Sequence, residues 1–250
     1  MGEALLEVTV LHARDVPGCR EGGADRLLHV VPDDEQPTAV GLLGTSPEPA
    51  AVSAVVRASD LPVRVVLRTG SGLGATGGEM TRLVALAEEY VALGAEGVAF
   101  GFLTGDLEVD VETCRAVAAA LPGVPWTFHR ALDLALEPAR SWQRLTAPPG
   151  LPGLTAVCTG GSPQGLEHGL DQLLAQLAAD PAAAPLAMAG GGLLAEHVPW
   201  LARAGVRQFQ VDLQVRPGAT LRSYVDADFV RSWRRVLDTA PGVHPRARPA

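Results

Sequence analysis

The sequence predicts an α/β protein with a single domain, a (β/α)8 barrel of the TIM type. Short apolar strands alternate with helical segments along the chain, and eight such units can close on themselves. The length of 250 residues suits one barrel, and a hydrophobic content of 47% is enough for one large core. We expect the barrel over residues 1–240 and a disordered, Pro- and Arg-rich tail over residues 241–250.

Each expected strand is a run of apolar residues bounded by glycine, proline or polar residues. In chain order, the strands are Leu5–Leu11, Arg26–Val31, Val63–Arg68, Gly97–Gly101, Trp126–His129, Leu154–Thr159, Leu186–Ala189 and Gln208–Asp212. Helical periodicity predicts helices over residues 15–22, 47–58, 79–94, 110–121, 137–146, 163–179, 195–204 and 226–238. Capping signals support several helix starts, namely Ser46-Pro47, Asp110 with Glu112, and Ser162-Pro163.

The charged residues exclude two classes of partner and one class of enzyme. The net charge is −8 at pH 7 and no basic stripe is present, whereas nucleic acids and anionic membranes are bound through clustered cations. The sequence contains no lysine, so all 20 basic residues are arginines. Because a Schiff-base enzyme needs a lysine amine, lysine-dependent aldolases and pyridoxal-phosphate enzymes are excluded.

The N-terminus and the cysteines indicate the compartment. The chain enters an alternating strand at once, without a charged leader region or a long apolar run. We therefore expect no signal peptide, no membrane span and a cytoplasmic location. Cys19, Cys114 and Cys158 are odd in number and widely spaced, which predicts reduced, buried thiols rather than disulfides.

A histidine, an arginine and an aspartate lie close together in the segment Trp126–Asp133, at the end of the fifth expected strand. Alternation along that strand sends His129 toward the barrel interior. Ligands of such barrels meet the loops at the C-terminal ends of the strands. His129 is therefore the candidate general acid or base, and Glu7 or Asp133 is the candidate to orient or assist it.

The same alternation predicts a polar lining contributed by several strands. With bulky apolar residues facing the helices, the inward residues are Glu7, Thr9, Arg68, Thr127, His129, Thr159, Gln210 and Asp212. A buried carboxylate such as Glu7 needs a partner, for which Arg68 or His129 is available. The lining can form a ligand site or a purely structural network, and both interpretations stay open.

Glycine-rich loops after the sixth and seventh strands predict a site for an anion. Barrels commonly bind phosphate there through backbone N–H groups. The candidate ligand-binding residues are Thr159, Gly160, Gly161, Gly190, Gly191 and Gly192. The alternative is that these glycines only permit tight turns between strand and helix.

The segment Thr69–Gly78 contains a formal G-x-G-x-x-G pattern at Gly72, Gly74 and Gly77. A dinucleotide site also needs an acidic residue at the end of the next strand. The chain reads Phe-Gly-Phe at 100–102 instead. We therefore interpret the segment as a flexible lid and not as a dinucleotide site.

These blocks together resemble the CutC family, whose members are associated by name with copper homeostasis. The matching blocks are residues 5–8, 21–26, 97–103 with Asp110, 127–133, 159–161 and 189–192, of which Thr-Phe-His-Arg at 127–130 is the most specific. The resemblance covers about residues 4–212 and implies a cytoplasmic barrel that forms a homodimer or homotetramer, with copper as the associated metal. It also implies a pocket formed by Glu7, Arg26, Arg68, His129, Arg130 and Asp133.

Departures from the family pattern bear on copper. Leu28-His29-Val30 stands where the family has Glu-Leu-Cys, Thr9 stands where it has a cysteine, and Gln210 replaces a histidine. Cu(I) prefers sulfur ligands, and alternation along the sixth strand points Cys158 outward. No metal site is therefore predicted, and copper is suggested only by the resemblance.

The function most consistent with these observations is a CutC-like barrel protein with a pocket for a small anionic ligand, in which Arg68 and Arg130 clamp the anion beside Gln210 and Asp212. One alternative is a metal-independent or hard-metal-dependent lyase or isomerase that acts on a phosphorylated or carboxylated small molecule. Another alternative is a non-catalytic binding or scaffold protein.

Overall fold

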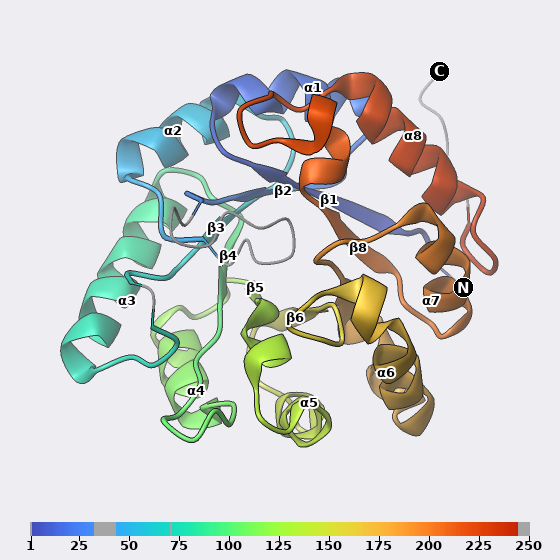
Figure 1. Ribbon diagram of the computed structural model, residues 1–250. Helices are drawn as coiled ribbons and strands as arrows, with labels where there is room; N and C mark the ends of the chain where they lie inside the picture. The colour runs from blue at the N-terminus through green and yellow to red at the C-terminus, as the bar shows by residue number, and fades with distance from the viewer. Residues whose placement is uncertain (1, 33–43, 71, 245–250) are drawn as a thin grey trace.

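The computed structural model describes residues 2–32, 44–70 and 72–244 and shows a closed barrel of parallel strands surrounded by helices (Figure 1). Within these residues, neighbouring strands pair in chain order from β1 to β8, and β8 pairs with β1. The fold predicted from the alternating pattern is therefore confirmed.

The observed elements follow the predicted ones closely. The strands are β1 Leu5–Val10, β2 Arg26–His29, β3 Val63–Val66, β4 Gly97–Phe100, β5 Trp126–Phe128, β6 Leu154–Thr159, β7 Ala187–Ala189 and β8 Gln208–Val211. The helices are α1 Val16–Gly22, α2 Pro49–Ala58, α3 Gly77–Ala92, α4 Val111–Ala120, α5 Pro138–Thr146, α6 Leu166–Ala179, α7 Val198–Arg203 and α8 Ala227–Asp238. Asp110 caps α4 as predicted, accepting a hydrogen bond from the Thr113 N–H at 3.0 Å.

Several strands end before the residues that the sequence pattern assigns to them. β3 stops at Val66 instead of Arg68, β5 at Phe128 instead of His129, and β8 at Val211 instead of Asp212. At these ends the chain leaves the ladder and turns into loops. The candidate site residues therefore lie just beyond the strands, at the C-terminal face of the barrel.

The core has two compartments, an apolar layer between strands and helices and a mixed interior inside the barrel. Outward-facing residues of the strands, such as Leu6, Val65 and Phe209, pack against the helices in one continuous apolar cluster. Inside the barrel, Leu28 and Ala99 belong to a small separate apolar cluster. Polar residues such as Glu7 and Thr127 share the interior with a second small apolar cluster of Ala156, Cys158 and Met188.

The predicted register of β6 is wrong. Trp126 on β5 pairs with Leu154, but the next residue, Thr127, pairs with Ala156, so Thr155 is an extra residue in β6. This irregularity reverses the alternation that follows it. Cys158 consequently points inward against Met188 instead of outward.

The prediction places the start of the disordered tail, residue 241, too early in the chain. Val243 forms a bridge with Gly2, the His244 N–H donates to the Gly2 carbonyl at 3.2 Å, and Arg207 Nη2 donates to the Gly242 carbonyl at 2.9 Å. These bonds hold residues 241–244 against the barrel. Residues 245–250, the rest of the predicted tail, lie outside the described residues. Residues 33–43, which belong to the loop Pro32–Ser46 between β2 and α2, also lie outside them. No described helix is long and apolar enough to cross a membrane.

Candidate functional site

A narrow cavity lies at the barrel axis and opens toward the C-terminal face. Its lining comes from six strands and the loop after β5: Leu28, Val66, Ala99, Thr127, His129, Arg130, Cys158 and Gln210. Ligands of this fold bind at this face. The cavity is therefore the place to look for chemistry.

Below the cavity, Glu7 is fully buried in a charged network. Arg26 Nε donates to Glu7 Oε2 at 2.5 Å, and Gln210 Nε2 donates to Oε1 at 2.8 Å. Burial raises the pKa of Glu7, but the charges of Arg26 and Arg64 and the Gln210 hydrogen bond outweigh it and hold the pKa below its usual range. Glu7 is therefore an ionised, paired group beneath the cavity, and its hydrogen bonds go to Arg26 and Gln210 and not to His129 or Arg68.

Arg64 completes this network, although it was not among the residues predicted from the sequence. Its Nη1 donates to Thr127 Oγ1 at 2.5 Å, and its Nε pairs with Glu96 Oε2 at 3.1 Å. Arg64 precedes Arg68 by four residues on the same strand pattern, so strict alternation would have placed it inside. The Nη2 atom of Arg26 is buried without a hydrogen-bond partner among the described residues.

His129 is held in one tautomer by the turn that follows β5. Its Nδ1 accepts a hydrogen bond from the Ala131 N–H at 3.2 Å, so the ring proton is on Nε2. Burial, reinforced by the charge of Arg68, lowers the pKa of His129 to about 4. Near neutral pH the ring is therefore an uncharged hydrogen-bond donor at the cavity wall, and its Nε2 is not available as a base.

Arg130 is fixed in place with part of its guanidinium unused. Its Nε donates to Asp133 Oδ2 at 2.8 Å and its Nη2 to the Ser162 carbonyl at 3.2 Å. A methyl group on Gly191 would come within 2.2 Å of the guanidinium carbon, so the cation lies directly against the glycine backbone. No described residue accepts a hydrogen bond from Nη1, and Arg130 lines the cavity.

Asp133 has a structural role toward the loop after β6. Besides Arg130, it accepts hydrogen bonds from Thr159 Oγ1 at 2.6 Å and from the Gly160 N–H at 2.9 Å. Burial raises the pKa of Asp133, while Arg130 and these two donors oppose the rise. The side chain orients Arg130 and does not contact His129 through a hydrogen bond.

The glycine loops divide into donors already used and donors still available. The Gly160 N–H binds Asp133, the Gly161 N–H donates to Thr159 Oγ1 at 2.9 Å, and the Gly190 N–H donates to the Thr159 carbonyl at 3.2 Å. Among the described residues, no acceptor forms a hydrogen bond with the backbone N–H of Gly191 or of Gly192. Both have positive φ angles, +79° and +75°, which favours glycine there.

Asp212, the residue that follows β8, lies at the same end of the barrel. It accepts a short hydrogen bond from Thr9 Oγ1. Burial raises the pKa of Asp212, against the lowering effect of the Thr9 bond and of the charges of Arg130 and Arg216. Thr9 and Asp212 thus form a second polar pair at the C-terminal face.

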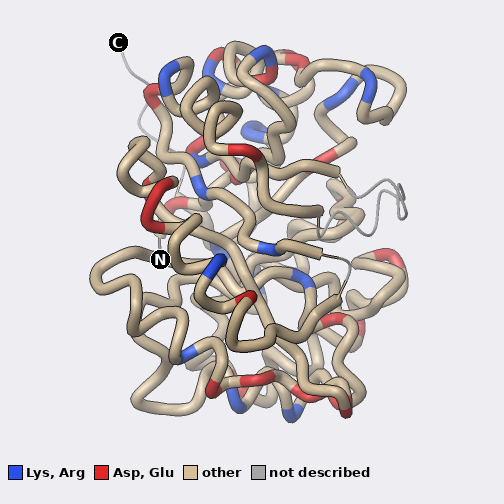
Figure 2. Tube along the Cα trace, turned by 90° about the vertical axis from the view of Figure 1, so that its left-hand side faces the viewer, with Lys and Arg blue, Asp and Glu red and all other residues tan. Residues whose placement is uncertain are grey.

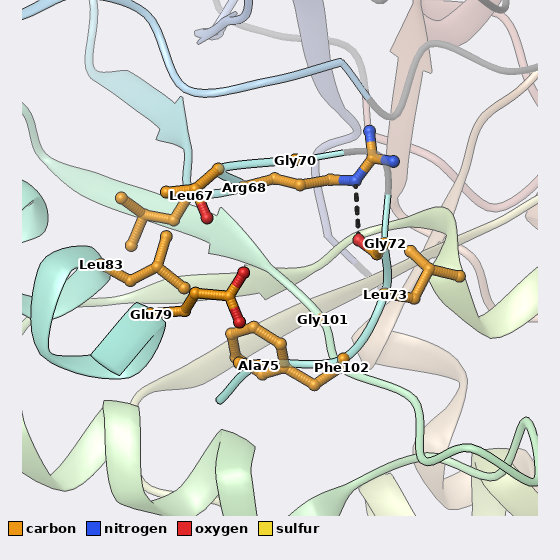
Figure 3. Close-up of a pocket in the computed structure, with 12 residues that line it drawn as sticks. Leu67, Arg68, Gly70, Gly72, Leu73, Ala75, Glu79, Leu83, Gly101 and Phe102 are labelled. Carbon is orange, nitrogen blue, oxygen red and sulfur yellow. Dashed lines mark hydrogen bonds between the residues drawn. The ribbon is translucent and has the colours of Figure 1, made fainter. Parts of the chain in front are cut away.

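Arg68 belongs to a second cavity, between β3, α3 and the loop after β4 (Figure 3). Its Nε donates to the Gly72 carbonyl at 3.4 Å and its Nη1 to the Gly44 carbonyl at 2.9 Å. Glu79, which forms a capping box with Thr76, lines the same cavity. Arg68 and Arg130 thus line different cavities, and the predicted lid segment contributes to the cavity of Arg68.

The barrel interior is more positive than the molecule as a whole. Figure 2 shows acidic and basic positions interspersed along the peripheral helices and loops. Among the described residues, the buried charges of the barrel interior and mouth are five arginines and four carboxylates: Arg26, Arg64, Arg68, Arg130, Arg216, Glu7, Asp15, Asp133 and Asp212. Arg64 also pairs with the partly exposed Glu96, so arginines and carboxylates balance among the described residues of this region, in a chain of net charge −8.

Comparison with known proteins agrees with this architecture. The sequence model of the CutC family matches residues 4–214. The chain belongs to the CutC family. A CutC protein of Klebsiella pneumoniae (strain 342) is 29% identical over 244 residues, 92% of each chain, and the human copper homeostasis protein cutC homolog is 30% identical over 65% of this chain and 57% of its own length. The crystal structure of CutC from Streptococcus agalactiae, 22% identical, has a TM-score of 0.68 over 83% of this chain and 98% of that chain, which shows the shared fold.

In the part of the chain that the structure describes, the donor atoms are not gathered as a copper ion requires. No group of three or more His, Cys, Asp or Glu side chains suited to a metal lies within the described residues. The inward Cys158 is a single thiol, and burial raises its pKa well above the usual range, which keeps it protonated. Cys19 and Cys114 are buried in the helical layer, among the residues of the outer apolar cluster.

Proposed function

We propose that this CutC protein binds a small anionic metabolite at the mouth of its barrel. The observation that supports the proposal is the Arg130 guanidinium, which Asp133 and the Ser162 carbonyl hold against Gly191, while no described residue accepts a hydrogen bond from its Nη1. An immobilised cation beside unused backbone N–H groups is a preorganised anion site.

Two further features support this assignment. The neutral His129 ring offers an N–H donor on the same cavity wall. The positive charge of Arg130 lies on this wall, and it attracts an anion but not an uncharged ligand. His129 acts in this proposal as a donor that positions the anion.

Two substitutions test the proposal by isothermal titration with acetate, sulfate and phosphate as probes. Arg130→Gln should weaken binding about tenfold or more, because a charge-assisted hydrogen bond contributes roughly 1.5–3 kcal/mol. Gly191→Ala should have a similar effect, because its methyl group would displace the guanidinium.

Gly123→Ala, in the turn between α4 and β5 and outside the site, is the matched control. It has the same left-handed backbone, but its methyl group would meet no atom within 4 Å. This variant should therefore lose only roughly 1 kcal/mol of stability through backbone strain and should bind the anions as tightly as the wild type. If no probe binds the wild type, or if all three variants bind equally well, the proposal is wrong and a scaffold without a ligand is the better interpretation.

A further inference from the structure

Three leucines on two neighbouring loops expose their side chains at the C-terminal face of the barrel. Leu107, after β4, is 45% exposed, and Leu134 and Leu136, after β5, are 38% and 73% exposed. The Leu136 N–H donates to the Leu107 carbonyl at 2.9 Å, which holds the two loops together. We call these three residues the leucine patch. Single exposed leucines are common on protein surfaces, whereas a group gathered from two loops is typical of an interaction surface.

Leu107 adopts a backbone conformation that disfavours leucine. Its φ angle is +56°, in the left-handed region, which glycine and asparagine occupy more readily than leucine does. The Leu107 N–H donates to the Thr104 carbonyl at 3.0 Å, so the residue lies in a turn. The turn disfavours this leucine, and nearly half of it is exposed. Strained residues of this kind cluster where a surface has a function.

Charged side chains of both signs surround the leucine patch. Glu108 follows Leu107 in the chain, and Glu137 follows Leu136. Arg140 Nη1 lies 3.2 Å from Glu108 Oε1 and 3.8 Å from Glu137 Oε2, and Arg144 Nη1 lies 2.8 Å from Glu108 Oε2. We call these two glutamates and two arginines the charged rim. An apolar centre within a polar, solvent-accessible rim is the usual anatomy of a protein–protein interface.

We propose that the leucine patch and its charged rim bind a second copy of this chain across a twofold axis. In a twofold dimer the same surface lies on both sides, so it must be complementary to itself. The charged rim meets this condition, because the arginines of one copy can lie opposite the glutamates of the other. A partner with one sign of charge would instead meet like charges along part of the rim.

This surface lies beside the proposed anion site and does not depend on it. Leu134 ends the short helical turn that begins at Arg130, so the second copy lies next to the turn that carries this arginine. The family resemblance implies a homodimer or homotetramer without indicating the surface, and the leucine patch supplies one. The dimer needs no bound anion, so the two proposals can fail separately.

Sedimentation velocity of the full chain over a wide range of protein concentration measures the association. Leu136→Ser should raise the dissociation constant of the dimer about a hundredfold, because a twofold interface buries each leucine twice and each burial contributes about tenfold. Leu107→Asn should weaken the dimer while keeping the fold, since asparagine suits the left-handed backbone. Leu194→Ser is the matched control, because Leu194 is 40% exposed after β7, and it should leave the dissociation constant unchanged.

Two charge reversals test whether the partner is a second copy. Glu137→Arg makes the charged rim mainly positive and Arg140→Glu makes it mainly negative, so each variant alone should self-associate several-fold more weakly than the wild type. An equimolar mixture of the two variants should associate again, because a positive rim then meets a negative rim. High salt should weaken this recovery, since it screens exposed charges from one another.

Three outcomes would overturn the proposal. A wild type that stays monomeric at every concentration leaves the leucine patch to a partner of another kind. A dimer that Leu136→Ser weakens no more than Leu194→Ser uses another face of the molecule. Failure of the mixed charge variants to associate excludes the twofold arrangement. Circular dichroism melts of each variant establish that a loss of association is not a loss of fold.

Discussion

The floor and the mouth of the barrel use the same residue types in opposite ways. On the floor, Glu7 accepts hydrogen bonds from Arg26 and Gln210, and Arg64 donates to Thr127 and Glu96. At the mouth, Arg130 has one carboxylate partner, Asp133, and keeps one nitrogen without a described partner. Paired charges beneath the cavity support the fold, whereas a donor that lines the cavity without a described partner is available to a ligand.

The largest expected effect comes from breaking the floor. Glu7→Ala leaves Arg26 and Arg64 without their shared counter-charge in a buried site, and we expect a loss of about 3–5 kcal/mol in the free energy of unfolding. Urea denaturation measures it. Glu88→Ala, at an exposed position on α3, is the control and should change stability by less than about 0.5 kcal/mol. A loss as small as that of the control would show that the floor network does not stabilise the fold.

A smaller effect, confined to acid pH, is expected at the mouth. Folding lowers the pKa of His129 from 6.5 to about 4. Between pH 6.5 and about pH 4, this histidine therefore binds a proton more readily in the unfolded chain than in the folded protein. The contribution of the neutral ring is complete above about pH 6.5 and falls by about 3 kcal/mol as the pH drops to about 4.

His129→Gln removes this titration. Unfolding measured from about pH 8 to about pH 4 should show the variant losing less stability than the wild type. The stability of the variant must be subtracted from that of the wild type at each pH, because burial also lowers the pKa of His29 and His197. Parallel pH curves for the two proteins would contradict the assignment of a neutral, buried His129.

No effect is expected from the thiols. Changing Cys19, Cys114 and Cys158 to serine should leave Cu(I) affinity, measured by competition with a chelator, unchanged, because burial raises the pKa of all three thiols and they do not cluster. A tight stoichiometric site that disappears in the triple variant would instead assign the inward Cys158 to copper and make the mouth a metal site.

Much of the fold could be predicted because local patterns carry it. The alternation in β1 and β8 predicts that Glu7 and Gln210 point inward, and the structure joins them by a hydrogen bond. The same reasoning fails in β6, where Thr155 is inserted opposite a strand far away in the sequence. An irregularity of this kind depends on how two strands pair, so the sequence of either strand alone does not indicate it.

The candidate site was predictable in position and not in detail. His129, Arg130 and Asp133 were expected at the mouth, and the structure places them there. It also shows Asp133 bonded to Arg130, Thr159 and Gly160, which no pattern in the segment indicates. Arg68, expected beside Arg130, instead bonds the carbonyls of Gly44 and Gly72.

The sequence by itself determined the barrel, the family and the absence of lysine chemistry, because periodicity, short motifs and composition are properties of the chain. Only the tertiary structure decided which donors remain for a ligand. Gly160, Gly161 and Gly190 use their N–H groups within the fold, while Gly191 and Gly192 have no described acceptor. The reason is that a hydrogen bond between loops depends on where distant strands end, and this is established only when the barrel closes.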